Sequence, residues 1–163
     1  MHPNAQLVVR FYTSLQNSDI ERIKSCYAPD VMYWDPVFRE LHGERAIAMW
    51  DMLCERGDEL RVEFGDVQAD NDSGSARWEA RYTFSRTGRP VHNLITSSFR
   101  FADGRIREQR DTFDVHRWAG MALGAPGRLL GWTPPLHAVL HRQSAKLIDD
   151  FTSKHHAPEA LEG

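Results

Sequence analysis

Tyr33 and Asp35 stand two positions apart at the end of a β-branched and aromatic run, Val31 to Trp34. Such a run favours a strand, and Pro36 ends it because proline lacks the amide hydrogen that a central strand donates. Side chains alternate across a strand, so Tyr33 and Asp35 share one face. If that face points inward, lost hydration raises the pKa of the carboxylate toward the range of a general base. Alternatively, Asp35 only begins a turn and caps the segment after it.

A second carboxylate, Asp111, shares a strand face with Gln109 and Phe113. We assign this face to the interior, where Asp111 either pairs with an arginine from a neighbouring strand or stays unpaired. If Asp35 and Asp111 share one low-dielectric cavity, their repulsion keeps one of them protonated. One residue type would then supply both an acid and a base.

Further residues of the predicted interior are aromatic or carry a hydroxyl or amide group. They are Trp50, Trp78, Tyr82, Phe84, Asn93, Ser97 and Phe113. Each one alone is consistent with ordinary core packing. Together they are too aromatic and too polar for a dry core, which indicates a pocket for a flat apolar ligand.

Three helices and a strand meander are expected to position these residues. Apolar spacing predicts a helix around Leu7–Leu15 with Asn4 as a candidate cap, a short helix from the cap Asp19 to Tyr27, and a helix over Glu44–Arg56 that ends at Gly57. Alternation then predicts four successive strands joined by short turns, an antiparallel meander. These strands lie near 60–67, 76–85, 91–101 and 106–115. The layout is α+β.

The C-terminal part is predicted to extend this domain. Residues 116–135 are apolar but interrupted by glycine and proline, which favours a packed loop or short helical turns over the pocket mouth. A helix over 136–151 would cover the pocket or join a dimer contact. We therefore expect one domain over 1–153, with 116–153 as a lid or dimer extension and 154–163 as a flexible tail.

Charge and residue composition indicate which binding partners, metals and cofactors to expect. The net charge of −3 and the pI near 6.2 give no reason to expect nucleic acid or an anionic membrane as a partner. Cys26 and Cys54 lack metal-ligand spacing and are expected to be buried free thiols in a cytoplasmic protein. His155 and His156 are expected in the tail, where no third ligand accompanies them. We expect no metal and no cofactor.

Three segments carry a resemblance to a known family. They are the stretch from Asp35-Pro36 to HGERAI at 42–47, FADGRI at 101–106 and RDTFD at 110–114. Their order and spacing resemble the nuclear transport factor 2-like superfamily, in its branch of ketosteroid isomerases, limonene epoxide hydrolases and SnoaL-like polyketide cyclases. The resemblance implies a cone-shaped, curved, mixed but mainly antiparallel sheet wrapped around N-terminal helices, and a homodimer.

The resemblance to ketosteroid isomerases assigns roles to three residues. Asp35 matches the proton-shuttling aspartate, and Tyr12 is a candidate for the oxyanion-hole tyrosine late in the first helix. Ser97 stands where the isomerases have a second, protonated aspartate. Since a serine is not the same acid, the resemblance argues against steroid isomerisation itself.

The resemblance to epoxide hydrolases is also incomplete. Tyr33 and Asp111 match a tyrosine and an aspartate that hold the attacking water, and Asp35 falls where an asparagine stands. Trp78 and Ala80 replace the central arginine and its partner aspartate, which argues against epoxide hydrolysis.

The residues and the resemblance together predict a small cofactor-independent isomerase, cyclase or dehydratase that acts on an apolar carbonyl compound. Asp35 would remove a proton beside the carbonyl, while Tyr33, Tyr12 or Ser97 would stabilise the enolate oxygen. Asp111 would return the proton or orient the substrate. The alternative is a non-catalytic ligand-binding or dimeric interaction module that uses the same fold.

Overall fold

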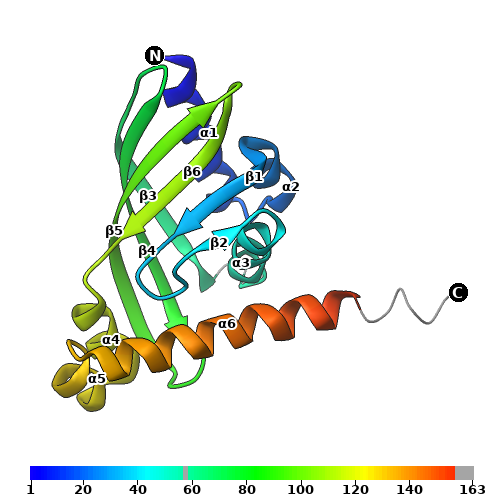
Figure 1. Cartoon of the computed structure of the whole chain (residues 1–163). Helices are drawn as coiled ribbons and strands as arrows, with labels where there is room; N and C mark the ends of the chain where they lie inside the picture. Colours follow the sequence, from blue (N-terminus) through cyan, green and yellow to red (C-terminus); the bar gives the residue numbers. More distant parts are fainter. Residues whose placement is uncertain (57–58, 157–163) are drawn as a thin grey trace, which may run out of the picture.

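An open, six-stranded mixed sheet organises the fold, with N-terminal helices against one face and C-terminal helices across one end (Figure 1). The computed structural model describes residues 1–56 and 59–156. This architecture confirms the predicted α+β class and its curved sheet with a C-terminal helical extension.

The helices on the sheet face are α1 Pro3–Gln16, α2 Ile20–Cys26 and α3 Glu44–Cys54. The strands are β1 Tyr27–Trp34, β2 Leu41–His42, β3 Arg61–Ala69, β4 Ser73–Phe84, β5 Arg89–Ala102 and β6 Arg105–Thr112. The C-terminal helices are α4 Val115–Leu123, α5 Ala125–Leu130 and α6 Pro134–His156.

The strands lie in the order β2-β1-β6-β5-β4-β3. The predicted antiparallel meander is confirmed in β3 to β6, while β1 pairs in parallel with β6. Register shifts interrupt three of these pairings. Such irregularities increase the local twist and bend a strand, which lets the sheet curve around α1 and α3 (Figure 1).

The ends of the first elements differ from the prediction. Asn4 is not the cap of α1: the helix begins at Pro3, and the ring of His2 accepts the backbone N–H of Asn4 at 3.0 Å. Asp19 does cap α2, by accepting the N–H of Arg22. Strand β1 begins at Tyr27, four residues before the predicted run. Pro29 is tolerated within it because this residue lies in the register shift, where the ladder to β6 is interrupted.

Later boundaries also changed. His42 belongs to the short strand β2 and pairs with Met32. The tail predicted from residue 154 starts inside α6, where His155 lies 2.9 Å from a carboxylate oxygen of Glu55. The predicted stop at Gly57 and the last seven residues of the tail lie outside the described part of the chain.

Two apolar clusters stabilise the fold. The larger one fills the space between the sheet and the helices α1 to α3. The smaller one joins the lower end of the sheet in Figure 1 to the C-terminal helices, through residues that include Val37, Trp118 and Leu140. Helix α6 also packs against the N-terminal part, because Ile148 belongs to the larger cluster and Asp149 pairs with Arg45 of α3 at 2.7 Å.

Both cysteines are buried free thiols, as predicted. Within 1–56 and 59–156, no helix is long and apolar enough to cross a membrane. The same residues contain no cluster of three or more His, Cys, Asp or Glu side chains that could hold a metal ion.

A close backbone contact fixes the corner between α4 and α5. A Cβ atom added at Gly127 would overlap the carbonyl group of Ala119 on α4. We expect Gly127→Ala to lower the free energy of unfolding by about 1–3 kcal/mol, because the two helices would have to separate. Gly65→Ala is the matched control, since its Cβ would meet no atom within 4 Å. Equal thermal stability of the two variants would contradict this close packing.

Candidate functional site

Asp35 occupies the first position after β1, and its two carboxylate oxygens have different partners. Oδ1 accepts the backbone N–H groups of Val37 and Phe38, at 2.8 and 2.7 Å. Oδ2 accepts the hydroxyl of Tyr33 at 2.8 Å. The side chain is 5 % exposed. Both interpretations of this residue therefore hold: Asp35 caps a turn through one oxygen and presents the other to an aromatic interior.

Asp111 lies on β6 and is 1 % exposed. Its Oδ1 accepts the hydroxyl of Ser97 at 2.5 Å and the amide of Gln109 at 3.1 Å. Its Oδ2 lies 3.3 Å from the hydroxyl of Tyr33. Of the two alternatives for Asp111, the arginine partner is not found: no Lys, Arg or His nitrogen of the described residues lies within 4 Å of this carboxyl group. The cross-strand neighbour of Asp111 is Ser97, a hydroxyl donor.

The Tyr33 hydroxyl joins the two carboxyl groups. It has one hydrogen to donate, and the shorter distance assigns that hydrogen to Asp35. A proton on Oδ2 of Asp111 could then be donated to the oxygen of Tyr33. Since Oδ1 of Asp111 already accepts two hydrogen bonds, Oδ2 is the better place for this proton. The arrangement is a carboxylate, a hydroxyl and a carboxylic acid in series.

The pKa values agree with this assignment. Burial raises the pKa of Asp111 to about 7, and the nearby charge of Asp35 adds to the effect. Burial also raises the pKa of Asp35, but the N–H groups of Phe38 and Val37 and the hydroxyl of Tyr33 oppose the rise. Burial keeps the pKa of Tyr33 well above its usual value, so this hydroxyl stays neutral. With a pKa of about 7, Asp111 holds a proton below neutral pH, as the geometry around Oδ2 allows.

Two chains of hydrogen bonds lead to Asp111 from the helices. In the first, Tyr12 of α1 donates to Ser97 at 2.7 Å, and Ser97 donates to Asp111. In the second, the indole N–H of Trp50 on α3 donates to Tyr27 at 2.8 Å, and Tyr27 donates to Gln109 at 2.5 Å. These chains fix the direction of every donor around the carboxyl group.

The SnoaL-like domain profile matches residues 8–109, which is more than half of the chain. This chain belongs to the SnoaL-like family. The family forms part of the nuclear transport factor 2-like superfamily, as the resemblance implied.

Solved structures agree with this SnoaL-like fold. A candidate SnoaL-like polyketide cyclase from Jannaschia sp. CCS1 superposes with a TM-score of 0.65 at 19 % identity, over 76 % of this chain and 93 % of that one. IdmH, a candidate polyketide cyclase from Streptomyces antibioticus, gives 0.62 at 21 %, over 77 % and 100 %. An M. tuberculosis LEH-like epoxide hydrolase gives 0.59 at 21 %, over 78 % and 95 %. No curated protein matches this sequence significantly.

The residues predicted to line the interior of this SnoaL-like domain do not all lie in the larger apolar cluster. Trp50, Trp78, Asn93 and Ser97 are buried, and the rings of Trp50 and Trp78 lie 6.0 Å apart. Tyr82 and Phe113 contact both apolar clusters. Phe84 was expected in the interior, but it packs edge-on against Trp118 in the smaller cluster. The reason is its position at the end of β4, where α4 crosses the sheet.

Sequence reasoning missed three features of the site. Gln109 was placed on the right face, but its contact with Asp111 was not predicted. Tyr27 was read as the end of a helix, although an aromatic residue beside a β-branched run is also typical of a strand. The indole N–H of Trp78 is the third feature: among the described residues it is the buried side-chain donor without a hydrogen-bond partner.

The C-terminal helices cover the end of the sheet nearest to Asp35. Trp118 of α4 donates its indole N–H to the hydroxyl of Tyr82 at 2.8 Å. The ring of His141 on α6 lies 3.1 Å from the carbonyl oxygen of Val37, two residues beyond Asp35. Both helices thus contact segments that border the carboxyl pair.

Proposed function

We propose that this protein catalyses cofactor-independent proton transfer on a small apolar carbonyl compound, as an isomerase, cyclase or dehydratase. The observation that carries the proposal is the Tyr33 hydroxyl held between two buried carboxyl groups, Asp35 and Asp111. Paired carboxyl groups with separated pKa values can work as base and acid at neutral pH.

In the proposed reaction, Oδ2 of Asp35 takes a proton from the carbon beside the carbonyl group. The electron pair of the broken C–H bond forms the enolate. Asp111 gives its proton to the hydroxyl of Tyr33, which passes a proton to the product. The proton on Asp35 then moves through the same hydroxyl to Asp111, so that both carboxyl groups return to their starting states. No other reactant is needed, because the protons balance over one turnover.

A free donor is required for the enolate oxygen. The hydroxyls of Tyr12, Tyr33 and Ser97, which we expected to act there, already donate to other groups. We assign the oxyanion contact to the unpaired indole N–H of Trp78, which lies in the same aromatic cluster as Tyr12 and Trp50. Tyr12 and Ser97 then position Asp111.

Trp78→Phe tests this contact. The variant keeps an aromatic ring in the cluster but loses the N–H, so we expect turnover to fall by about 10²–10³-fold. Thermal stability should change little or rise, because the change removes a buried donor that has no partner. Steady-state kinetics and a melting curve on the same preparation give both readouts. Unchanged turnover would remove Trp78 from the proposed site.

The substrate must reach a closed interior. Asp35 and Asp111 are almost fully buried, and the C-terminal helices cover the nearest opening through Trp118 and His141. We propose that α4 and α6 act as a lid that moves when substrate binds. This proposal retains the lid function that we predicted for residues 116–153.

The activity can be tested before the substrate is known. Solvent deuterium exchange at the carbon beside the carbonyl group would be followed by mass spectrometry for a panel of flat apolar ketones. Enzyme-dependent exchange in any of them supports the proposal. If the protein binds ketones of the panel but catalyses no deuterium exchange in any of them, a non-catalytic ligand-binding module becomes the better account.

The alternative is a non-catalytic ligand-binding module. The observation in its favour is that the hydroxyls of Tyr12, Tyr27, Tyr33 and Ser97 all have partners inside the network, as in a polar core. The likeness to polyketide cyclases, at about one-fifth identity, supports the fold rather than a particular reaction. The two candidates differ in whether bound ketones exchange deuterium.

A further inference from the structure

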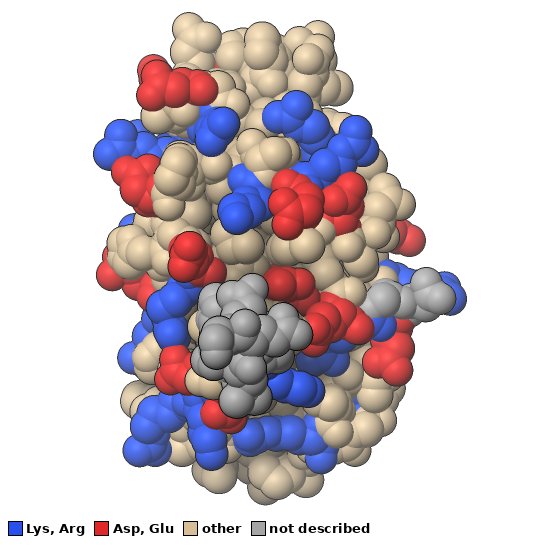
Figure 2. Space-filling model, turned by 90° about the vertical axis from the view of Figure 1, so that its right-hand side faces the viewer, with Lys and Arg blue, Asp and Glu red and all other residues tan. Residues whose placement is uncertain are grey.

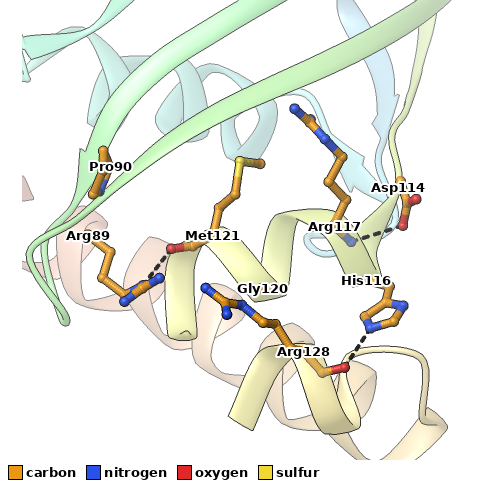
Figure 3. A pocket seen from close by; sticks show the side chains of 8 residues that line it. All are labelled: Arg89, Pro90, Asp114, His116, Arg117, Gly120, Met121 and Arg128. Carbon is orange, nitrogen blue, oxygen red and sulfur yellow. Dashed lines mark hydrogen bonds between the residues drawn. The ribbon is translucent and has the colours of Figure 1, made fainter. Parts of the chain in front are cut away.

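A second group of chemically active side chains lies outside the carboxyl site, in a hollow between β5 and the helices α4 and α5 (Figure 3). The hollow has a volume of about 400 Å³. Its lining includes Arg89 of β5, Arg117 of α4 and Arg128 of α5, together with His116 and Asp114. Three arginines thus border one small volume that the proposed reaction does not use, and the guanidinium group of Arg117 points toward β5, away from those of Arg89 and Arg128 (Figure 3).

The three arginines have no acidic partner in the structure. Within 1–56 and 59–156, no carboxylate oxygen lies within 4 Å of their nitrogens. Asp114 does line the hollow, but its Oδ1 accepts the backbone N–H of Arg117 and caps α4. The hollow therefore has an excess of positive charge that no side chain neutralises.

Backbone contacts hold two of these arginines in place. Nε of Arg89 donates to the carbonyl oxygen of Met121 at 2.8 Å, and a terminal nitrogen of Arg117 donates to that of His92 at 3.0 Å. Each bond uses one N–H, and a guanidinium group has five. Several donors on each side chain thus remain for a ligand, and their positions are already fixed.

Two glycines, Gly120 of α4 and its C-cap Gly124, leave room beside the helix. A Cβ at Gly120 would lie 3.2 Å from the Cγ of Arg128, and one at Gly124 would lie 3.2 Å from the Cζ of Arg89. These two glycines let both arginines lie directly on the helix. Both side chains lie on the same side of α4 in Figure 3. An anion bound there would offset the repulsion between these two like charges.

The surrounding chain adds to the positive potential. Residues 115–148 contain four Arg or Lys residues, three histidines and no Asp or Glu, in a protein whose net charge is −3. Figure 2 shows the side of the molecule that is on the right in Figure 1, where basic side chains lie along the lower end beside some acidic ones; α4 and α5 lie at the left of Figure 1, outside this view. An anion approaching the C-terminal helices therefore meets a local field opposite in sign to the net charge.

We propose that the hollow between β5, α4 and α5 is a binding site for a compact phosphate-type anion. Guanidinium groups match phosphate because they offer parallel N–H donors and stay charged at every physiological pH. The phosphate can belong to a free phosphate ester or to a lipid headgroup. A lipid headgroup is one of the two sources because two exposed apolar residues, Leu129 and Leu130, directly follow Arg128. The site is independent of the proposed proton transfer at Asp35.

The test is a titration of the full-length protein with inorganic phosphate and with glycerol phosphate, followed by amide NMR shifts. We expect saturable shifts at Gly120 and Gly124. Arg128→Gln should weaken binding at least about tenfold, because a charge-assisted contact is lost. Arg128 is the preferred target, since Arg89 also contacts the end of α4.

Arg105→Gln is the control for net charge, because Arg105 is exposed at the start of β6, outside the hollow. Equal binding by Arg128→Gln and Arg105→Gln, or no saturable shift in the wild type, would overturn the proposal. Phosphatidylcholine vesicles with and without phosphatidic acid separate the two sources. A lipid headgroup is supported if the protein binds the vesicles, Arg128→Gln abolishes this binding, and free phosphate competes with it. Saturable phosphate binding without vesicle binding supports a free ester.

Discussion

Asp35→Asn is expected to reduce catalysed deuterium exchange by about 10²–10⁴-fold, because the amide cannot accept the proton that the proposed mechanism removes from carbon. The fold should survive this change. The side-chain oxygen of asparagine can still accept the N–H groups of Val37 and Phe38, which are the contacts that cap the turn. The measurement is the initial rate of exchange on whichever ketone the wild type accepts, together with a melting curve.

Asp103→Asn is the matched control for this experiment. Asp103 is an exposed carboxylate in the turn between β5 and β6, with a positive φ that asparagine tolerates well. We expect its exchange rate to equal that of the wild type. If Asp35→Asn retains the wild-type rate as well, Asp35 is not the base, and the non-catalytic alternative becomes the better account of the site.

Asp111→Asn is expected to stabilise the protein at alkaline pH while lowering its activity. Burial raises the pKa of Asp111 from its usual value of 3.8 to about 7 in the folded protein. Below about pH 4, both the folded and the unfolded chain carry the proton, and Asp111 costs no stability. As the pH rises toward 7, the unfolded chain loses this proton first, so stability falls with rising pH.

Above about pH 7 the folded protein holds Asp111 as a buried carboxylate, and the free energy of unfolding is lowered by the full amount. The pKa shift from 3.8 to about 7 corresponds to a loss of at most about 4 kcal/mol. Asparagine resembles the protonated acid: its oxygen can accept from Ser97 and Gln109, and its NH₂ can donate to Tyr33. We therefore expect Asp111→Asn to gain about 2–4 kcal/mol over the wild type at pH 8 and little at pH 4.

Urea unfolding between pH 4 and pH 8 measures this difference, with Asp103→Asn as the control that should follow the wild-type curve. A variant that is less stable than the wild type at every pH would show that Asp111 is ionised in a favourable setting, and the acid role would be lost. If Asp111→Asn is more stable than the wild type and catalyses deuterium exchange more slowly, Asp111 serves function at a cost in stability.

The sequence by itself determined the local arrangement of the site. The period of two along a strand placed Tyr33 and Asp35 on one face, and Gln109 and Asp111 on another, since alternation depends only on the backbone. Glycine and proline likewise indicated that residues 116–135 form no long helix. The turn signals between the strands predicted the meander of β3 to β6, which the structure confirms.

The tertiary structure decided how these faces meet. Parallel pairing of β1 with β6 sets Tyr33 beside Gln109, and antiparallel pairing of β5 with β6 sets Ser97 beside Asp111. Register between strands far apart in sequence depends on the packing of both faces, which local patterns do not encode. For this reason the sequence predicted an inward-facing carboxylate at Asp35, but only the fold joined it through Tyr33 to a second buried carboxyl group, that of Asp111.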